Sequence, residues 1–293
     1  SMNKHATTLA PLNGIMTAIL TPVHETLTID TDRLVRHARD LLAQGGSRIS
    51  TFGSTGEGVA FAPAEKREAV AALLAAGVRP DQLLPAIMTS SVGTAAAEMH
   101  DLVALGCRDI LMLPPFYYGA PSTAGLVAFF EAVFERAGRP DIRLVLYNIP
   151  HMTGVTITHE LVRALQAGKG PHIAGVKDST GDLASGVAYV EAFPELAIFT
   201  GDDRVLPHLL RVGGAGMIGG LPNLYVEDLV ALYRDPDGAR AAELAALAAQ
   251  RIAEIDSAGG LLALKAGLAT RTGDEAWRRA MPPLDGSFRA GSR

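Results

Sequence analysis

Apolar residues along the chain fall into two kinds of segment that alternate. Short apolar runs rich in β-branched residues occur eight times, with centres about 19 to 36 residues apart. Most are apolar throughout, which is typical of parallel strands covered on both faces. They span residues 15–20, 48–52, 83–88, 109–113, 143–148, 173–177, 196–200 and 216–219. This cadence predicts repeated strand–helix–strand units.

The longer segments between these runs have the period of an amphipathic helix. One clear apolar stripe consists of Leu34, Val35, Ala38, Leu41 and Leu42. Asp30 and Thr31 precede it and can cap the helix. Pro63 suits the first turn of the next helix, where its missing N–H would be unpaired anyway. From Glu227 to the end the pattern is helical, with no convincing strand.

Eight strand–helix units in roughly 220 residues, followed by a helical extension, predict a (β/α)8 barrel. We expect residues 1–225 to form this barrel and to carry the active site. Residues 226–293 are expected to form a C-terminal helical extension that packs on the barrel as part of one structural unit. A doubly wound sheet is the alternative fold, and periodicity alone does not distinguish the two.

Composition narrows the class of protein. The chain has 293 residues, 48% of them apolar, and a net charge of -5, so it favours a packed domain and argues against nucleic acid or an anionic membrane as partner. Cys107 is the one cysteine, which excludes an intrachain disulfide and favours a reducing compartment. Ser1-Met2 reads as a non-native leader with no signal pattern after it, and the apolar run 69–78 is too short to cross a bilayer. We therefore expect a cytoplasmic protein.

Polar residues gather where several predicted strands end, which in a barrel is the active-site face. Lys177 is the most informative, because it alone among the five lysines closes an apolar strand. Burial disfavours the charged ammonium, so such an amine can attack a carbonyl. The structural alternatives are a lysine that reaches out to solvent or pairs with Asp178. Lys265, in a helical segment, is the rival amine, although a structural role is the better interpretation there.

Two phenols and two hydroxyls accompany Lys177. Tyr147 and Tyr118 end predicted strands and can relay protons, since a phenol both donates and accepts. Ser54 and Thr55 lie in a glycine-rich loop whose exposed N–H groups can hold a small carboxylate or phosphate. The alternative for either tyrosine is a residue at the barrel rim with its hydroxyl in water. The alternative for Ser54 and Thr55 is an ordinary helix cap.

Other motifs carry less weight. Residues 214–219 match a dinucleotide fingerprint, but no convincing helix opens within them, so a glycine-rich eighth strand is the better interpretation. The eight histidines are scattered singly, without the spacing of a metal site. Cys107 precedes a strand and is interpreted as a core residue. We expect neither a metal nor a cofactor.

Five motifs together resemble the dihydrodipicolinate synthase and N-acetylneuraminate lyase family of pyruvate-dependent class I aldolases. They stand in family order, at about family spacing, over nearly the whole chain: Gly53–Glu57, Pro115–Tyr118, Tyr147–Pro150, Gly175–Gly181 and Gly201–Asp203. The resemblance implies a (β/α)8 barrel with extra C-terminal helices. It also implies a homotetramer built as a dimer of dimers.

The resemblance further assigns roles by position. Lys177 would form a Schiff base with pyruvate or another 2-oxo acid, and Tyr147 would shuttle protons there. Ser54 and Thr55 would hold the keto-acid carboxylate, with the main chain at Ile218 closing the far side. Tyr118 matches a tyrosine that reaches into the neighbouring subunit's site and completes a relay with Ser54 and Tyr147.

The sequence departs from the family's best-known members at the second substrate. Met152 stands where dihydrodipicolinate synthases carry a carboxylate-binding arginine, and it looks more like the lyases. Asp202 and Asp203 match lyase positions near the hydroxylated tail of a sugar acid, but Gly220 replaces a lyase serine. We therefore expect a carbon–carbon lyase that acts on pyruvate and an aldehyde, and not a true dihydrodipicolinate synthase.

Other activities remain open at this stage. A dehydratase of a 2-oxo sugar acid can use the same imine, and a synthase with altered substrate binding is also compatible. A barrel that binds a keto acid without turnover is disfavoured by the retained lysine, tyrosines and hydroxyls. The interpretation as a nicotinamide oxidoreductase depends on the weak dinucleotide fingerprint alone.

Overall fold

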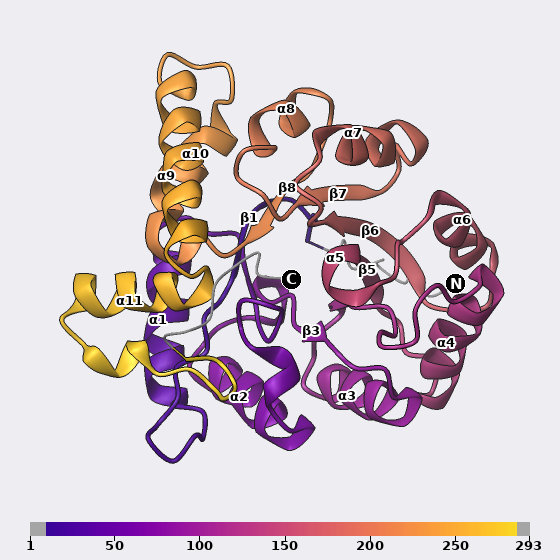
Figure 1. The fold of residues 1–293 in the computed structure, drawn as a ribbon. Coiled ribbons are helices and arrows are strands. Elements are labelled where there is room, and N and C mark those ends of the chain that lie inside the picture. Colours follow the sequence, from indigo (N-terminus) through magenta and orange to yellow (C-terminus); the bar gives the residue numbers. More distant parts are fainter. Residues whose placement is uncertain (1–9, 286–293) are drawn as a thin grey trace, which may run out of the picture.

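The computed structural model describes residues 10–285, and its eight strands form a nearly closed parallel barrel (Figure 1). The strand order is β2-β1-β8-β7-β6-β5-β4-β3. Between β2 and β3 the ring continues through the parallel bridge of Ile49 with Leu83. The strands are β1 (Gly14–Ala18), β2 (Arg48–Ser50), β3 (Ala86–Ile87), β4 (Asp109–Met112), β5 (Arg143–Asn148), β6 (His172–Asp178), β7 (Ala197–Thr200) and β8 (Gly216–Gly219). Each of the eight predicted runs overlaps a strand and the ring is nearly closed, so the (β/α)8 barrel is confirmed and the doubly wound sheet is wrong.

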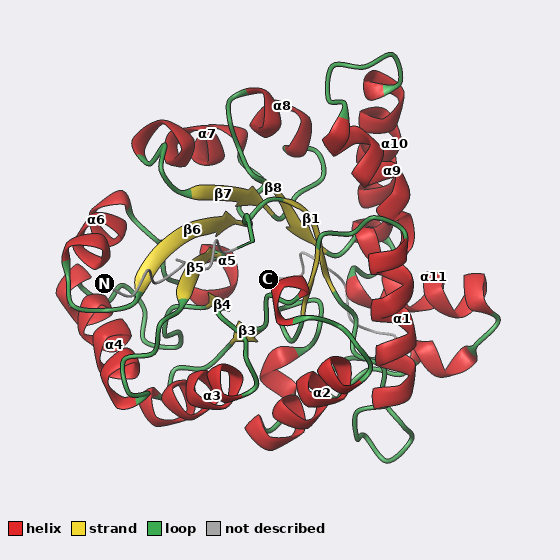
Figure 2. Ribbon diagram, turned by 180° about the vertical axis from the view of Figure 1, so that it is seen from behind, coloured by secondary structure: helices red, strands yellow, loops and turns green. Residues whose placement is uncertain are grey.

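Helices surround the strands on the outside (Figure 2). The described helices are α1 (Thr31–Ala43), α2 (Pro63–Ala75), α3 (Val92–Ala104), α4 (Thr123–Arg136), α5 (Pro150–Thr153), α6 (His159–Ala167), α7 (Leu183–Ala192), α8 (Leu206–Arg211), α9 (Pro222–Arg234), α10 (Ala241–Ser257) and α11 (Leu261–Thr272). Short 3-10 turns occur at η1 (Gly58–Ala60), η2 (Pro80–Gln82) and η3 (Glu275–Arg278). Among the described helices, none is both long and apolar enough to span a bilayer.

The helix starts follow the predicted local signals. The Asp30 side chain accepts a hydrogen bond from the Arg33 N–H, as an N-cap does. Pro63 is the first residue of α2, as expected. The predicted stripe of α1 faces inward, with Leu34, Ala38 and Leu41 buried.

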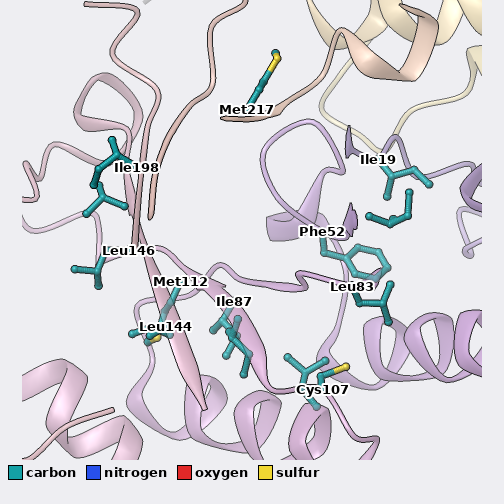
Figure 3. Close-up of a cluster of buried hydrophobic side chains, with 14 of the residues drawn as sticks. Ile19, Phe52, Leu83, Ile87, Cys107, Met112, Leu144, Leu146, Ile198 and Met217 are labelled. Atoms are coloured by element: carbon teal, nitrogen blue, oxygen red, sulfur yellow. The ribbon is translucent and has the colours of Figure 1, made fainter. Parts of the chain in front are cut away.

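Two apolar layers explain why the strands are apolar throughout. On β5, Leu144 and Leu146 point outward into the layer under the helices, whereas Val145 and Tyr147 belong to the cluster inside the barrel. Figure 3 shows part of the outer layer, which also contains Cys107, so its interpretation as a core residue is confirmed. Both faces of each strand are therefore covered.

The C-terminal helices lie together on one side of the barrel, beside α1 (Figures 1 and 2). A small cluster of Leu20, Leu224, Leu264, Leu268, Ala269 and Trp277 joins them to the end of β1. Helix α9 begins at Pro222 and runs across the expected boundary between residues 225 and 226. The expected leader, Ser1-Met2, lies outside the described residues.

A buried histidine couples this junction to pH. His37 Nε2 lies 2.9 Å from Asn223 Oδ1, and burial lowers the pKa of His37 to about 4. Because the unfolded chain binds this proton near pH 6.5, the stabilising contribution is complete above that pH and is lost as pH falls towards 4. We expect the free energy of unfolding to drop by up to about 3 kcal/mol over this window. Urea unfolding of the protein and of His37→Gln at several pH values tests this, and an equally steep fall in the variant would contradict it.

Candidate active site

Lys177 and Tyr147 lie side by side at the carboxyl ends of two neighbouring strands. They are partners in the register of β5 and β6. Lys177 Nζ is 4.3 Å from the centroid of the Tyr147 ring, and the two residues are only 4% and 2% exposed. The expected amine and phenol are thus brought together inside the barrel mouth.

The hydroxyl of Ser54 completes this cluster. Ser54 Oγ lies 2.9 Å from Tyr147 Oη, across 93 positions of sequence. Gly58 is needed for the tight turn of this loop, because a Cβ there would overlap the Phe52 carbonyl, and its N–H donates to the Gly53 carbonyl. The turn carries the hydroxyl from the end of β2 to the end of β5, so a proton can pass between Ser54 and Tyr147.

Asp178, the expected alternative partner of Lys177, is engaged elsewhere. Its carboxylate accepts hydrogen bonds of 3.0 Å from Asn148 Nδ2 and from Thr180 Oγ1. Asn148 Oδ1 in turn accepts from the Ile157 N–H. Within residues 10–285, Lys177 forms no ion pair with a carboxylate. The network therefore joins the ends of β5 and β6, and the Asp178 carboxylate forms no ion pair with the Lys177 amine.

Lys265, the rival amine, is fully committed to the structure. Its Nζ lies 2.6 Å from Glu57 Oε2 and donates to the carbonyls of Thr21 and Arg279 at 2.9 and 2.6 Å. Two hydrogen bonds and one ion pair therefore engage the ammonium. Burial lowers the Lys265 pKa, and the Glu57 carboxylate opposes that shift. The geometry favours the structural interpretation.

A further glycine shapes the space around Lys177. A Cβ at Gly201 would overlap Ser179 Oγ and lie 3.4 Å from Lys177 Cε. Gly201 directly follows β7, and sequence reasoning gave it no separate role. The signal available in the sequence was a glycine directly after a predicted strand.

The other residues expected to bind substrate differ in how deeply they are buried. Ile218 is buried on β8 in the inner layer, and Thr55 is half-buried beside Gly220, where a Cβ would come within 3.1 Å of Thr55 Oγ1. A serine at Gly220 would therefore crowd Thr55. The segment 216–219 is strand β8, which confirms the strand interpretation of the fingerprint-like glycines.

Asp202 and Asp203 differ in environment. The Asp202 carboxylate receives two hydrogen bonds, of 3.0 and 2.8 Å, from the Arg204 guanidinium. Asp203 is buried, and its carboxyl oxygens have no hydrogen-bond partner among the described residues. Burial, reinforced by the charge of Asp202, holds the Asp203 pKa well above its usual range.

Tyr118 stands apart from the cluster of its own chain. It is 81% exposed and packs edge-on against Tyr117, with ring centroids 5.3 Å apart. Tyr117 adopts a φ of 89°, an unfavourable conformation for a bulky residue. The loop thus presents Tyr118 outward from the barrel rim.

A cavity of 350 Å³ opens beside the cluster, with Ser54 in its wall. Met152, on the short helix α5, also lines it. The other expected site residues are not among its lining residues: Lys177, Tyr147, Thr55, Tyr118, Ile218, Asp202 and Asp203. Among residues 10–285, no group of three or more His, Cys, Asp and Glu side chains is placed to hold a metal ion.

Comparison with known proteins gives the family. The model of the dihydrodipicolinate synthetase family matches residues 11–282. The chain is 32% identical over 225 residues to an uncharacterized DapA-like lyase of Chloroflexus aurantiacus, covering 74% of this chain and 72% of that protein. It is also 32% identical to the 4-hydroxy-tetrahydrodipicolinate synthase of Anaeromyxobacter sp., covering 90% of both chains. The crystal structure of dihydrodipicolinate synthase from Agrobacterium tumefaciens superimposes with a TM-score of 0.84 at 32% identity and covers 93% of both chains. The chain belongs to the dihydrodipicolinate synthetase family.

Proposed function

We propose that this protein is a pyruvate-dependent class I lyase that forms or cleaves a carbon–carbon bond through an imine on Lys177. The observation that carries the proposal is the buried Lys177 amine, which pairs with no described carboxylate and lies over the ring of Tyr147, whose hydroxyl pairs with that of Ser54. Membership of a family whose relatives include a lyase and synthases supports it. An imine formed there serves as the electron sink for a carbanion next to it.

Each cluster residue then has a chemical task. The Lys177 amine attacks the ketone of pyruvate, and loss of water gives the imine. Tyr147 moves protons at this centre, with Ser54 as its hydrogen-bonded relay. Thr55, Ser54 and the main chain at Ile218 hold the keto-acid carboxylate. Lys177 is only 4% exposed, so the imine would form out of contact with bulk water.

Assembly is the next part of the proposal. We assign Tyr118 to the site of a neighbouring subunit, in a homotetramer built as a dimer of dimers. The outward position of Tyr118 and the strained φ of Tyr117 support this role. The barrel and its C-terminal helices form one unit of this assembly, in the cytoplasm.

Subunit mixing tests the shared site. Lys177→Ala and Tyr118→Phe are each expected to be inactive or nearly so. Hybrid dimers contain one site with both native residues, so mixing the two variants should restore part of the activity, up to about half per hybrid dimer. Activity is measured as pyruvate release after subunit exchange has been verified by native mass spectrometry. If verified hybrids recover no activity, Tyr118 acts in the site of its own chain or has no part in the reaction.

The second substrate is expected to lack a carboxylate near its aldehyde. Met152 carries neither charge nor donor, and losing a hydrogen bond to a charged group costs about 1.5–3 kcal/mol, roughly ten- to a hundred-fold in rate. We expect feeble synthesis from pyruvate and aspartate semialdehyde, and clear pyruvate release from a 4-hydroxy-2-oxo acid with an uncharged tail. Coupled assays of both reactions on one preparation check this. A synthase kcat/KM within tenfold of roughly 10⁴ M⁻¹s⁻¹ would contradict it.

A further inference from the structure

The cavity beside Ser54 is built almost entirely from apolar groups. Its walls include Met88, Leu113, Phe116, Ile149, Met152 and Leu261. These side chains come from the ends of strands β3, β4 and β5, from α5 and from the start of α11. Since Ser54 belongs both to this wall and to the Tyr147 pair, a molecule held in the cavity lies next to the proton relay.

The polar side chains in the wall already have partners within the protein. Ser54 pairs with Tyr147, and Thr153 Oγ1 donates to the Ile149 and Val155 carbonyls at 3.2 and 3.0 Å. Glu57 is bound to Lys265. Among the described residues that line the cavity, no side chain offers an unpaired charge. A charged or polyhydroxylated tail placed here would lose hydrogen bonds to water without regaining them.

A segment from the far end of the chain forms one wall. We call residues 281–284, Met-Pro-Pro-Leu, the C-terminal strap, and all four line the cavity. The Met281 N–H donates to Glu57 Oε1 at 2.7 Å, and Lys265 Nζ donates to the Arg279 carbonyl just before the strap. The buried Glu57–Lys265 pair therefore fixes the strap against the loop that carries Ser54.

Building on the proposed function, we propose that the aldehyde partner of pyruvate carries a compact apolar group, aryl or branched alkyl, which binds in this cavity between Met152 and the C-terminal strap. A cavity of about 150 Å³ suffices to bind benzene, so 350 Å³ accommodates a substituted ring. Of the two residues expected near a hydroxylated tail, Asp202 is bound by Arg204, and neither Asp202 nor Asp203 lines this cavity. A sugar-like tail held in the cavity would therefore meet neither carboxylate.

The reaction balances without a further reactant. In cleavage, a 4-hydroxy-2-oxo acid with an aryl or alkyl group on C4 forms an imine with Lys177 and releases water. The 4-hydroxyl proton passes to the Tyr147–Ser54 relay, the C3–C4 bond breaks, and its electron pair moves into the imine to give an enamine. The aldehyde leaves, C3 takes up a proton, and water hydrolyses the imine to pyruvate and the free amine.

A pair of substrates tests this on the full-length protein. Pyruvate release is measured from 4-hydroxy-2-oxo-4-phenylbutanoate and from 2-keto-3-deoxygluconate, which share the reacting atoms and differ in the tail. We expect kcat/KM to be at least about tenfold higher for the phenyl compound, because only its tail gains from apolar burial. Equal or better cleavage of the sugar acid, or no cleavage of the phenyl compound, would overturn the proposal.

Variants of the wall locate the effect. Met152→Ser and Leu284→Ser should each lower the phenyl-to-sugar ratio about tenfold. Met152 is 64% exposed, so its truncation leaves the core intact. Val212→Ser is the matched control: this exposed residue precedes β8 at the opposite end of the barrel, and the ratio should not change. An unchanged ratio in both wall variants would also overturn the proposal.

A separate measurement distinguishes this inference from the proposed function. Reductive trapping of pyruvate on Lys177 reports the imine and does not involve the aldehyde. If pyruvate is trapped on Lys177 but the phenyl compound is not preferred, only the proposal of an apolar aldehyde is refuted. Absence of trapping would refute the imine mechanism itself, and the inference with it.

Discussion

Borohydride added in the presence of pyruvate should attach one reduced pyruvate to each chain, at Lys177. The expectation follows from a buried amine that pairs with no described carboxylate and lies 4.3 Å from the Tyr147 ring. Lys177→Ala should abolish the adduct and reduce kcat by roughly 10³-fold or more, since it removes the nucleophile. Intact-mass measurement followed by peptide mapping locates the adduct.

Lys265 supplies the contrast in this experiment. Lys265→Met leaves the Glu57 carboxylate buried without its partner, which typically costs about 3–5 kcal/mol of stability. We expect its urea midpoint to fall, while folded molecules still react with pyruvate at Lys177. The mechanism fails if the label maps to Lys265 in the native protein, or if no keto acid gives an adduct.

Tyr147→Phe should lower kcat by about 10²- to 10⁴-fold, the usual contribution of a positioned acid–base group. The substitution keeps the ring beside Lys177 and removes only the hydroxyl that lies 2.9 Å from Ser54. Steady-state pyruvate release measures the loss, and circular dichroism checks that the fold persists.

Tyr189→Phe is a matched control for that loss. Tyr189 is also buried, but its hydroxyl donates to the Ile157 carbonyl and takes no part in the cluster. We expect this variant to lose stability, by about 1–3 kcal/mol for the unsatisfied carbonyl, and to keep kcat within a few-fold. Equal losses of kcat in the two variants would show that Tyr147 acts only through packing.

Local pattern was sufficient for the architecture and for the central amine. Most strands are short and apolar because helices cover the outer face and the inner cluster covers the other face, so the eight runs could be recognised one by one. The cap at Asp30 and the first-turn Pro63 are interactions within one turn. Lys177 was identified for the same reason: a charge that ends an apolar run is visible without knowledge of its neighbours.

Contacts between distant segments were beyond that pattern. Nothing near Glu57 in sequence indicates that its carboxylate holds Lys265 and the N–H of Met281, 224 positions away. Likewise, Gly201 looks like any glycine after a strand until the side chain of Lys177 is placed beside it.

The sequence by itself determined the barrel, the strand ends that carry the polar residues, and the position of Lys177. The reason is that the apolar period of a strand or helix and the place where it ends are each encoded within a few neighbouring residues. The family resemblance had already implied a relay between Ser54 and Tyr147, whose hydroxyls the structure brings within 2.9 Å. Only the tertiary structure decided that Lys265 is bound by three partners and that the strap closes an apolar cavity. These depend on which loops the closed barrel brings to one rim. Barrel closure pairs β1 with β8, Gly14 beside Gly216, and no pattern within a few residues specifies a pairing so distant in sequence.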